Sequence, residues 1–163
     1  MLDNVCDKLY NKMLKGSVRM IAIGCDHGGF ALKQVIMKHL DETGREYIDL
    51  GTYDEQSVDY PDIAKKVCAE LTSGTAKEGI LICGTGIGMN ICANKIKGIR
   101  AAQCSDTYSA KMTRRHNDSN VLTMGGRIIG PELAIEITDA FLTNKFEGGR
   151  HQRRLDKINE LEK

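Results

Sequence analysis

Short apolar runs alternate along the chain with longer stretches in which apolar residues recur every three or four positions. The short runs are typical of buried strands, and the longer stretches are typical of amphipathic helices. The predicted strands are Met20–Cys25, Tyr47–Leu50, Gly79–Cys83, Ile99–Cys104 and Val121–Met124. The predicted helices are Phe30–Glu42, Pro61–Leu71, Met89–Lys95, a segment that Ser105 or Asp106 caps and that runs to about Arg115, Leu133–Phe141 and Gln152–Glu162. Because strand and helix alternate throughout, the pattern predicts a parallel sheet with helices on both faces.

Polar and glycine-rich segments follow several of the predicted strands. Asp26 and His27 follow the first strand, the run 84–88 follows the third, and Arg127 comes shortly after the fifth. In open parallel sheets, ligands bind beyond the carboxyl ends of the strands. We therefore expect a functional site at this edge, and we group with it the polar stretch 116–118 that precedes the fifth strand.

The glycine-rich loop 84–88 reads Gly-Thr-Gly-Ile-Gly and leads into a predicted helix. Glycines let a backbone approach a ligand closely and direct several N–H groups at it. The spacing is not the dinucleotide-binding GxGxxG, because Met89 occupies the place of the third glycine, and no Gly-Lys-Ser/Thr of a P-loop follows. A ligand-binding loop, a nucleotide-binding turn and a plain tight turn therefore all stay open on the loop alone.

The chain has six cysteines, and no two of them form a Cys-x-x-Cys pair, which argues against a zinc cage. Free cysteines are usually buried and behave as small hydrophobic residues. Cys83 differs because it ends the third strand directly before the glycine loop and a helix N-terminus, an environment that favours the thiolate. Cys25 also ends a strand, but the charge of Asp26 opposes a thiolate there. We expect Cys83 to be reactive and four others to be inert, namely Cys25, Cys68, Cys92 and Cys104.

Histidines and arginines supply further candidates. His116 lies in a polar stretch, where it is suited either to general acid–base chemistry near neutral pH or simply to solvent. His27, at a strand end, is the stronger histidine candidate. Arg150 and Arg154 are four residues apart and would share a helix face, and guanidinium groups bind phosphate oxygens well. Because positive charge at a helix N-terminus is unfavourable, this placement indicates an anionic partner.

Composition narrows the classes of function. The chain has 163 residues, 41% hydrophobic and 28% charged, with a net charge of +1. These values are typical of one globular domain and unlike those of a general nucleic-acid binder. No apolar run is long enough to span a bilayer. Because acidic and basic residues are mixed among residues 1–19, unlike in a secretory signal or a transit peptide, we expect a cytoplasmic protein.

Seven short segments stand out when they are taken together and in order: Asp26–Gly29, Ser57–Asp62, Cys83–Gly88, Ala93–Lys95, Gly98–Ala101, His116–Asp118 and Glu147–His151. Each segment is modest, but the ordered set is specific. The set resembles the type B ribose-5-phosphate isomerases, and the resemblance runs from about Met20 to the C-terminus. We accordingly expect residues 20–163 to form a single isomerase domain, and residues 1–19 to form an N-terminal extension that is helical or disordered.

The resemblance implies a Rossmann-like three-layer α/β/α sandwich with a five-stranded parallel sheet. It implies interconversion of ribose 5-phosphate and ribulose 5-phosphate through a cis-enediolate, without metal or cofactor. It also implies a homodimer or a dimer of dimers in which two subunits share each active site. The partner molecules would then be a phosphorylated sugar and further copies of this chain, with neither nucleic acid nor membrane involved.

The resemblance also implies roles for residues at matching positions. Cys83 would be the proton acceptor, His116 the proton donor in ring opening, and Thr85 a residue that orients the substrate or relays a proton. The implied substrate-binding residues are Asp26, His27, Gly84, Thr85, Gly86, Ile87, Gly88, Asn117, Arg127, Arg150 and Arg154. Arg150 and Arg154 would reach the phosphate from the neighbouring subunit.

Three alternatives stay open. Isomerases of allose 6-phosphate and galactose 6-phosphate share much of this pattern, so the sugar is less certain than the reaction. A nucleotide-binding module would explain the glycine loop, but it would leave Cys83, His116 and the C-terminal arginines without a role. A non-catalytic protein on the same scaffold would have no need for Cys83, Thr85 and His116 together.

Overall fold

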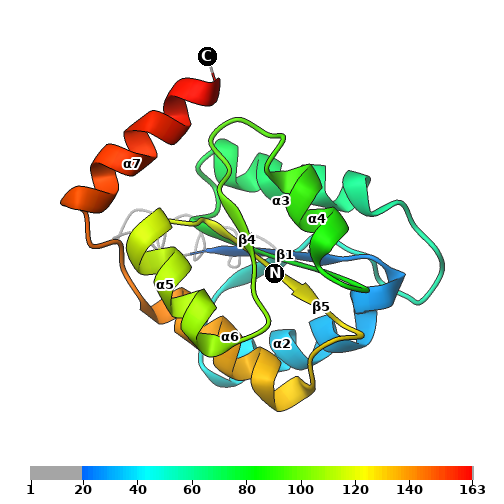
Figure 1. Cartoon of the computed structure of the whole chain (residues 1–163). Coiled ribbons are helices and arrows are strands. Elements are labelled where there is room, and N and C mark those ends of the chain that lie inside the picture. Colours follow the sequence, from blue (N-terminus) through cyan, green and yellow to red (C-terminus); the bar gives the residue numbers. More distant parts are fainter. Residues whose placement is uncertain (1–19, 163) are drawn as a thin grey trace, which may run out of the picture.

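The computed structural model describes residues 20–162, which contain a five-stranded, all-parallel sheet in the order β2-β1-β3-β5-β4. The strands are β1 (Ile21–Cys25), β2 (Tyr47–Asp49), β3 (Glu78–Cys83), β4 (Ala101–Gln103) and β5 (Val121–Gly125). Helices cover both faces of this sheet (Figure 1). The predicted Rossmann-like α/β sandwich is thereby confirmed. The predicted N-terminal extension lies outside the described residues.

The helices divide into two layers that bury separate apolar clusters against the sheet. Helices α3 (Tyr60–Thr72) and α4 (Ile87–Ala93) pack on one face, and α2 (Phe30–Glu42), α5 (Thr107–Asn117) and α6 (Pro131–Thr143) pack on the other. A 3-10 turn, η1 (His27–Gly29), follows β1, and α7 (Arg150–Asn159) with η2 (Glu160–Glu162) ends the chain. None of the helices that the structure describes is both long and apolar enough to cross a bilayer.

The three central strands, β1, β3 and β5, are buried on both faces, as expected of a sheet covered by two helical layers. Side chains alternate between the layers along β3: Ile80 and Ile82 join the cluster under α2, α5 and α6, whereas Leu81 and Cys83 join the cluster under α3 and α4. This alternation places Cys83 at the carboxyl end of a central strand, on the α3/α4 side of the sheet.

All the predicted strands and helices are present, and several of their bounds differ. Helix α4 begins at Ile87 rather than Met89, because left-handed Gly86 (φ +80°) turns the chain directly into the helix. Strand β4 is shorter than predicted, and α7 begins two residues earlier. Helix α5 continues through His116 and Asn117, which were predicted to lie in a loop, and it ends at left-handed Asp118 (φ +45°).

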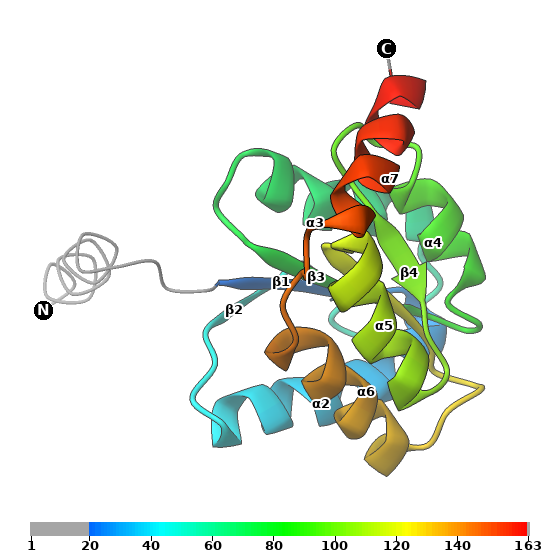
Figure 2. The same ribbon diagram turned by 60° about the vertical axis from the view of Figure 1, so that its left-hand side comes forward.

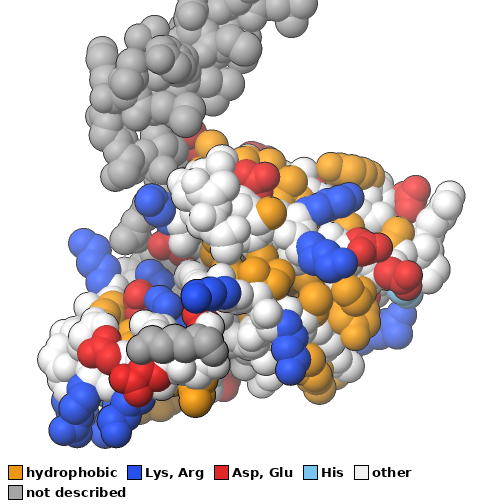
Figure 3. All heavy atoms as spheres, turned by 90° about the horizontal axis from the view of Figure 1, so that it is seen from above, with side chains coloured by type: hydrophobic (Ala, Val, Ile, Leu, Met, Phe, Trp, Pro, Cys, Tyr) orange, Lys and Arg blue, Asp and Glu red, His pale blue; other side chains and the backbone are white. Residues whose placement is uncertain are grey.

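The C-terminal helix α7 stands apart from the two-layered body. It extends beside α5 and β4 and projects beyond them in both ribbon views (Figures 1 and 2). Its residues His151 and Leu155 are buried, but Ile158 and, in η2, Leu161 are exposed to 42% and 84%. The space-filling view shows further apolar side chains gathered at the centre of one face, with Lys and Arg side chains around them (Figure 3). In the single chain, the end of this arm therefore exposes apolar surface to water.

Candidate active site

Asp26 and His27 are fixed in the turn that follows β1. The Asp26 carboxylate caps η1, because its Oδ1 accepts hydrogen bonds from Gly28 N (2.8 Å) and Gly29 N (3.2 Å). These two hydrogen bonds satisfy the carboxylate of Asp26, which is buried. Val58 N donates to His27 Nδ1 over 3.5 Å, which favours the tautomer with its proton on Nε2. The half-exposed His27 ring therefore presents its Nε2–H as a hydrogen-bond donor at the carboxyl edge of the sheet.

The Cys83 thiol differs from the other buried thiols in its surroundings. Gly86 N donates a hydrogen bond to Cys83 Sγ over 3.1 Å, and the residue is 5% exposed. By contrast, burial raises the pKa of Cys25 to about 11 and the pKa values of Cys68 and Cys104 to about 12. These raised pKa values favour the protonated thiol at neutral pH, which is consistent with the prediction that these three cysteines are inert.

Two glycines of the loop 84–88 are explained by packing within the chain, whether or not a ligand binds there. A side chain at Gly86 would lie 2.9 Å from the backbone of Met124, and one at Gly88 would lie 2.8 Å from the ring of Tyr60. Both positions therefore require glycine even without a ligand. Thr85, directly before Gly86, is exposed, and its Oγ1 accepts a hydrogen bond from Ile87 N over 3.4 Å.

The segment after β5 is joined to the same loop. Gly126 N donates to Cys83 O (2.8 Å), and Arg127 N donates to Gly84 O (3.1 Å). The exposed side chain of Arg127 lies over Gly84, with its Cδ 3.6 Å from where a Cβ would be. We call Asp26, His27, Cys83, Arg127 and the loop 84–88 the thiol cluster; the structure brings these predicted residues together at the carboxyl edge of the sheet.

His116 belongs to a second group, which we call the histidine cluster and which consists of Arg115, His116, Glu147, Arg150 and His151. The His116 and His151 rings are stacked, with centroids 4.2 Å apart and planes 7° apart. The Nε2 atoms of both rings lie 3.8 Å from Glu147 Oε2. Arg115 forms an ion pair with Glu147 Oε1, and Arg150 Nε lies 3.5 Å from His151 Nε2.

The two clusters lie at opposite edges of the sheet. Cys83 pairs with Gly125 at the carboxyl edge, whereas Gly79 N donates to Asn120 O, four residues after His116, at the amino edge. From Gly79 to Cys83 the strand rises about 13 Å. Grouping the stretch 116–118 with the carboxyl edge was therefore wrong, because α5 returns the chain to the other end of the sheet.

Asn117, Arg150 and Arg154 also fall on the side of the histidine cluster. Asn117 follows His116 in the last turn of α5, and both arginines lie on α7 with exposed side chains. Within one chain, the structure therefore does not bring Cys83 together with His116 or with the C-terminal arginines. The predicted catalytic pair meets only if two chains contribute to one site.

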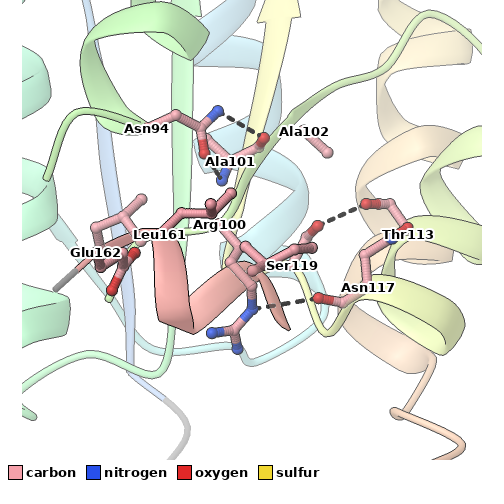
Figure 4. Close-up of a pocket in the computed structure, with 11 residues that line it drawn as sticks. Asn94, Arg100, Ala101, Ala102, Thr113, Asn117, Ser119, Leu161 and Glu162 are labelled. Atoms are coloured by element: carbon pink, nitrogen blue, oxygen red, sulfur yellow. Dashed lines mark hydrogen bonds between the residues drawn. The ribbon is translucent and has the colours of Figure 1, made fainter. Parts of the chain in front are cut away.

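A pocket of about 440 Å³ opens beside the histidine cluster, between β4, the end of α5 and the C-terminal segment (Figure 4). The amide of Asn94 pairs with the backbone of Ala101 on one side of this pocket, donating to its O and accepting from its N at 2.9 Å each. Arg100 Nε donates to Asn117 O over 3.2 Å on another side. Asn117 is the one predicted substrate-binding residue in the lining of this pocket.

Sequence reasoning missed Glu147 and His151 as members of a site. Both lie in the segment Glu147–His151, which contributed to the family resemblance, but neither was given a role of its own. The signal that identifies them is their place in one short segment, Glu147–His151, together with the return of this segment to the end of α5. Glu147 N donates to Arg115 O over 3.0 Å and makes that connection.

His116, Glu147 and His151 are, among the described residues, a group whose ligand atoms lie close enough to hold a metal ion, all within 4.8 Å of one another. The geometry is unfavourable for one. Because the rings are stacked almost parallel, the lone pairs of their nitrogens lie in parallel planes and do not converge on one point. Arg115 also occupies the other carboxylate oxygen, Oε1. The arrangement suits proton exchange better than metal binding.

Comparisons with known proteins agree with the geometry. Residues 21–158 match the family described as Ribose/Galactose Isomerase. Ribose-5-phosphate isomerase B of Escherichia coli is 51% identical over 145 residues, which cover 89% of this chain and 97% of that protein. D-erythrulose-4-phosphate isomerase of Pectobacterium atrosepticum is 46% identical over 144 residues, covering 87% and 94%.

A solved structure gives the same result for the fold. The chain superposes on ribose-5-phosphate isomerase B of Clostridium thermocellum with a TM-score of 0.86 and 50% sequence identity, and the match covers 88% of this chain and 97% of that one. The match is close in both sequence and fold and extends over nearly the whole length of that chain. By its sequence and its fold, this chain belongs to the ribose/galactose isomerase family.

Proposed function

We propose that this protein interconverts ribose 5-phosphate and ribulose 5-phosphate through a cis-enediolate, with Cys83 as the base. The observation that carries the proposal is the Gly86 N–Cys83 Sγ hydrogen bond, which holds this sulfur at the strand end beside the loop 84–88 in a chain of the isomerase family. The Cys83 thiolate takes the proton from C2 of the open aldose. The resulting thiol returns a proton to C1, and the carbonyl moves to C2.

The charge that develops on the substrate oxygens needs donors close to the base. Backbone N–H groups of the loop 84–88 are held there by the strand-to-helix turn, and each such donor typically contributes about 3–4 kcal/mol to transition-state binding. Thr85, exposed in the same loop, relays a proton between the two oxygens. Asp26 and His27 bind the sugar hydroxyls from the neighbouring turn.

Two further tasks require the histidine cluster. The substrate ring must open, which needs an acid at the ring oxygen, and the phosphate must be held. His116 is suited to the first task, and Arg150, Arg154 and Arg127 are suited to the second. Because His116, Arg150 and Arg154 lie at the opposite edge from Cys83, each active site takes these three residues from a second copy of the chain, whereas Arg127 comes from the same chain as Cys83. The projecting arm of α7, with exposed Ile158 and Leu161, supports such an association.

The sugar is the part of the proposal with a specific competitor. The family description includes galactose isomerases, and one relative is named for a four-carbon ketose phosphate. Allose 6-phosphate, galactose 6-phosphate and erythrulose 4-phosphate are therefore the alternatives to compare. A nucleotide is disfavoured, because the packing of Met124 and Tyr60 accounts for Gly86 and Gly88 without one.

The test is an isomerase assay of the purified chain with each of these sugars. We expect the highest kcat/KM for ribose 5-phosphate. Cys83→Ala should remove at least about 10²-fold of kcat, the lower end of what a positioned base contributes, and should leave sugar-phosphate binding largely intact. Cys68→Ala, at a buried thiol in the same apolar cluster, is the matched control and should stay active. A wild-type chain that converts none of the sugars, or a fully active Cys83→Ala variant, would contradict the proposal.

A further inference from the structure

Glu147 is held against the end of α5 by contacts from its backbone and its side chain. Its N–H donates to Arg115 O over 3.0 Å, and Arg115 Nε and Nη2 both contact its Oε1. Residue 147 lies in a connecting segment that would otherwise allow the carboxylate several orientations. With one oxygen held by a guanidinium, the direction of the other oxygen is defined.

That second oxygen, Oε2, faces two imidazoles at once. The Nε2 atoms of His116 and His151 each lie 3.8 Å from it. The two rings are stacked at 4.2 Å, so they cannot both become charged without strong repulsion. The carboxylate therefore faces two rings of which only one can be charged at a time.

Burial disfavours the charged form of one ring, that of His151. His151 is 5% exposed, and burial lowers its pKa, with the charges of His116, Arg150 and Arg154 acting in the same direction and Glu147 opposing them. His116 has a side chain that is 36% exposed and keeps contact with water. The buried ring of His151 consequently acts as a flat support, while the exposed ring of His116 is the one that a substrate can reach.

We propose that Glu147 is a positioning residue for His116: its Oε2 holds the ring in the orientation from which it donates a proton to the sugar ring oxygen. The proposal rests on the proposed function, in which His116 is the acid. Glu147 does not touch the substrate in this scheme and acts through the histidine. The charged groups around the pair are Arg115 on α5 and Arg150 and Arg154 on α7.

The experiment compares Glu147→Gln with wild type on two substrates. The amide keeps the size of the side chain and an oxygen for Arg115, but it removes the charge that faces His116. With ribose 5-phosphate, which must be opened, kcat should fall about tenfold, a part of the 10²–10⁴ that a general acid contributes, with KM within about twofold. With ribulose 5-phosphate, an open-chain ketose, kcat should fall less than about threefold; because the equilibrium constant is unchanged, the rest of the loss in kcat/KM appears there as a higher KM.

Asp139→Asn is the matched control, because Asp139 Oδ2 contacts His39 Nε2 at 3.0 Å in another histidine–carboxylate pair, between α6 and α2. This variant should retain wild-type kinetics on both sugars. A second comparison places Glu147→Gln in a His116→Ala background. If Glu147 acts through His116, the substitution should cause no further loss there.

The outcomes separate the two proposals. An inactive wild-type chain overturns the proposed function and this inference with it. An active wild type with an equally active Glu147→Gln variant overturns the inference alone. Equal losses of kcat on both sugars also overturn the inference, and so does the same loss of kcat with and without His116. A merely structural effect of Glu147 would depend neither on the histidine nor on the form of the sugar.

Discussion

Gly86 N and Cys83 Sγ are joined by a hydrogen bond of 3.1 Å that closes the turn between β3 and α4. The turn requires Gly86, because its φ of +80° and the nearby backbone of Met124 leave no room for a side chain. The residue that shapes the turn is therefore also the one whose amide meets the sulfur. Any change in this turn should alter the chemistry of Cys83 and the stability of the fold together.

Alkylation provides a direct test of the thiol assignments. With iodoacetamide at pH 8, Cys25, Cys68 and Cys104 should stay unlabelled in the folded protein, because their raised pKa values leave almost no thiolate. Loss of isomerase activity should follow the labelling of Cys83, measured by peptide mass spectrometry, and sugar phosphate should slow both. Inactivation without label on Cys83 would assign the essential thiol elsewhere.

Mixing two inactive variants tests whether active sites are shared between chains. In a mixed dimer of Cys83→Ala and His116→Ala chains, one of the two sites contains both substitutions and the other contains neither. Random reassortment should therefore restore about a quarter of the wild-type activity, since half of the dimers are mixed and each has one intact site. If unfolding and refolding the mixture gives no more activity than the separate variants, Cys83 and His116 do not meet across an interface.

The buried ring of His151 should make stability depend on pH. Its pKa is lowered in the folded chain, so between the ordinary histidine pKa of about 6.5 and its folded value the unfolded chain binds more protons. Stability is then unaffected above about pH 6.5 and falls as the pH drops below that value. Urea unfolding between pH 7 and 5 should show a smaller decline for His151→Phe, which retains a stacking ring, than for wild type. An identical decline in both would show that His151 is not the group responsible.

Gly86 and Gly98 have nearly the same φ angle, so alanine at each position separates the cost of a steric clash from the cost of backbone strain. Gly86 and Gly98 have φ of +80° and +82°, but a side chain at Gly98 would meet nothing within 4 Å. Each change to alanine should cost about 1–2 kcal/mol for the left-handed conformation. Gly86→Ala should cost measurably more in urea unfolding, because the backbone of Met124 must move as well. Equal costs would mean that the turn relaxes freely.

The alternation of strands and helices was sufficient to predict the fold, because each apolar run is bounded by turn residues and the buried strands show no competing helical period. The thiol cluster followed from the rule for strand ends, which concerns residues directly after a strand. His116 was misplaced because the same rule was applied to residues before a strand. Glu147 and His151 were missed for a different reason: only tertiary packing shows that their segment returns to the end of α5.

Helix α5 has 11 residues, with the capping Asp106 at one end and His116 in its last turn. Each residue added to a helix turns everything beyond it by about 100° around the axis. An insertion within α5 would therefore rotate the imidazole away from Glu147 while the start of the helix stayed in place. The contact between His116 and Glu147 therefore constrains the number of residues between Asp106 and His116. The open turn at Gly74, where a side chain would meet nothing within 4 Å, is under no such constraint.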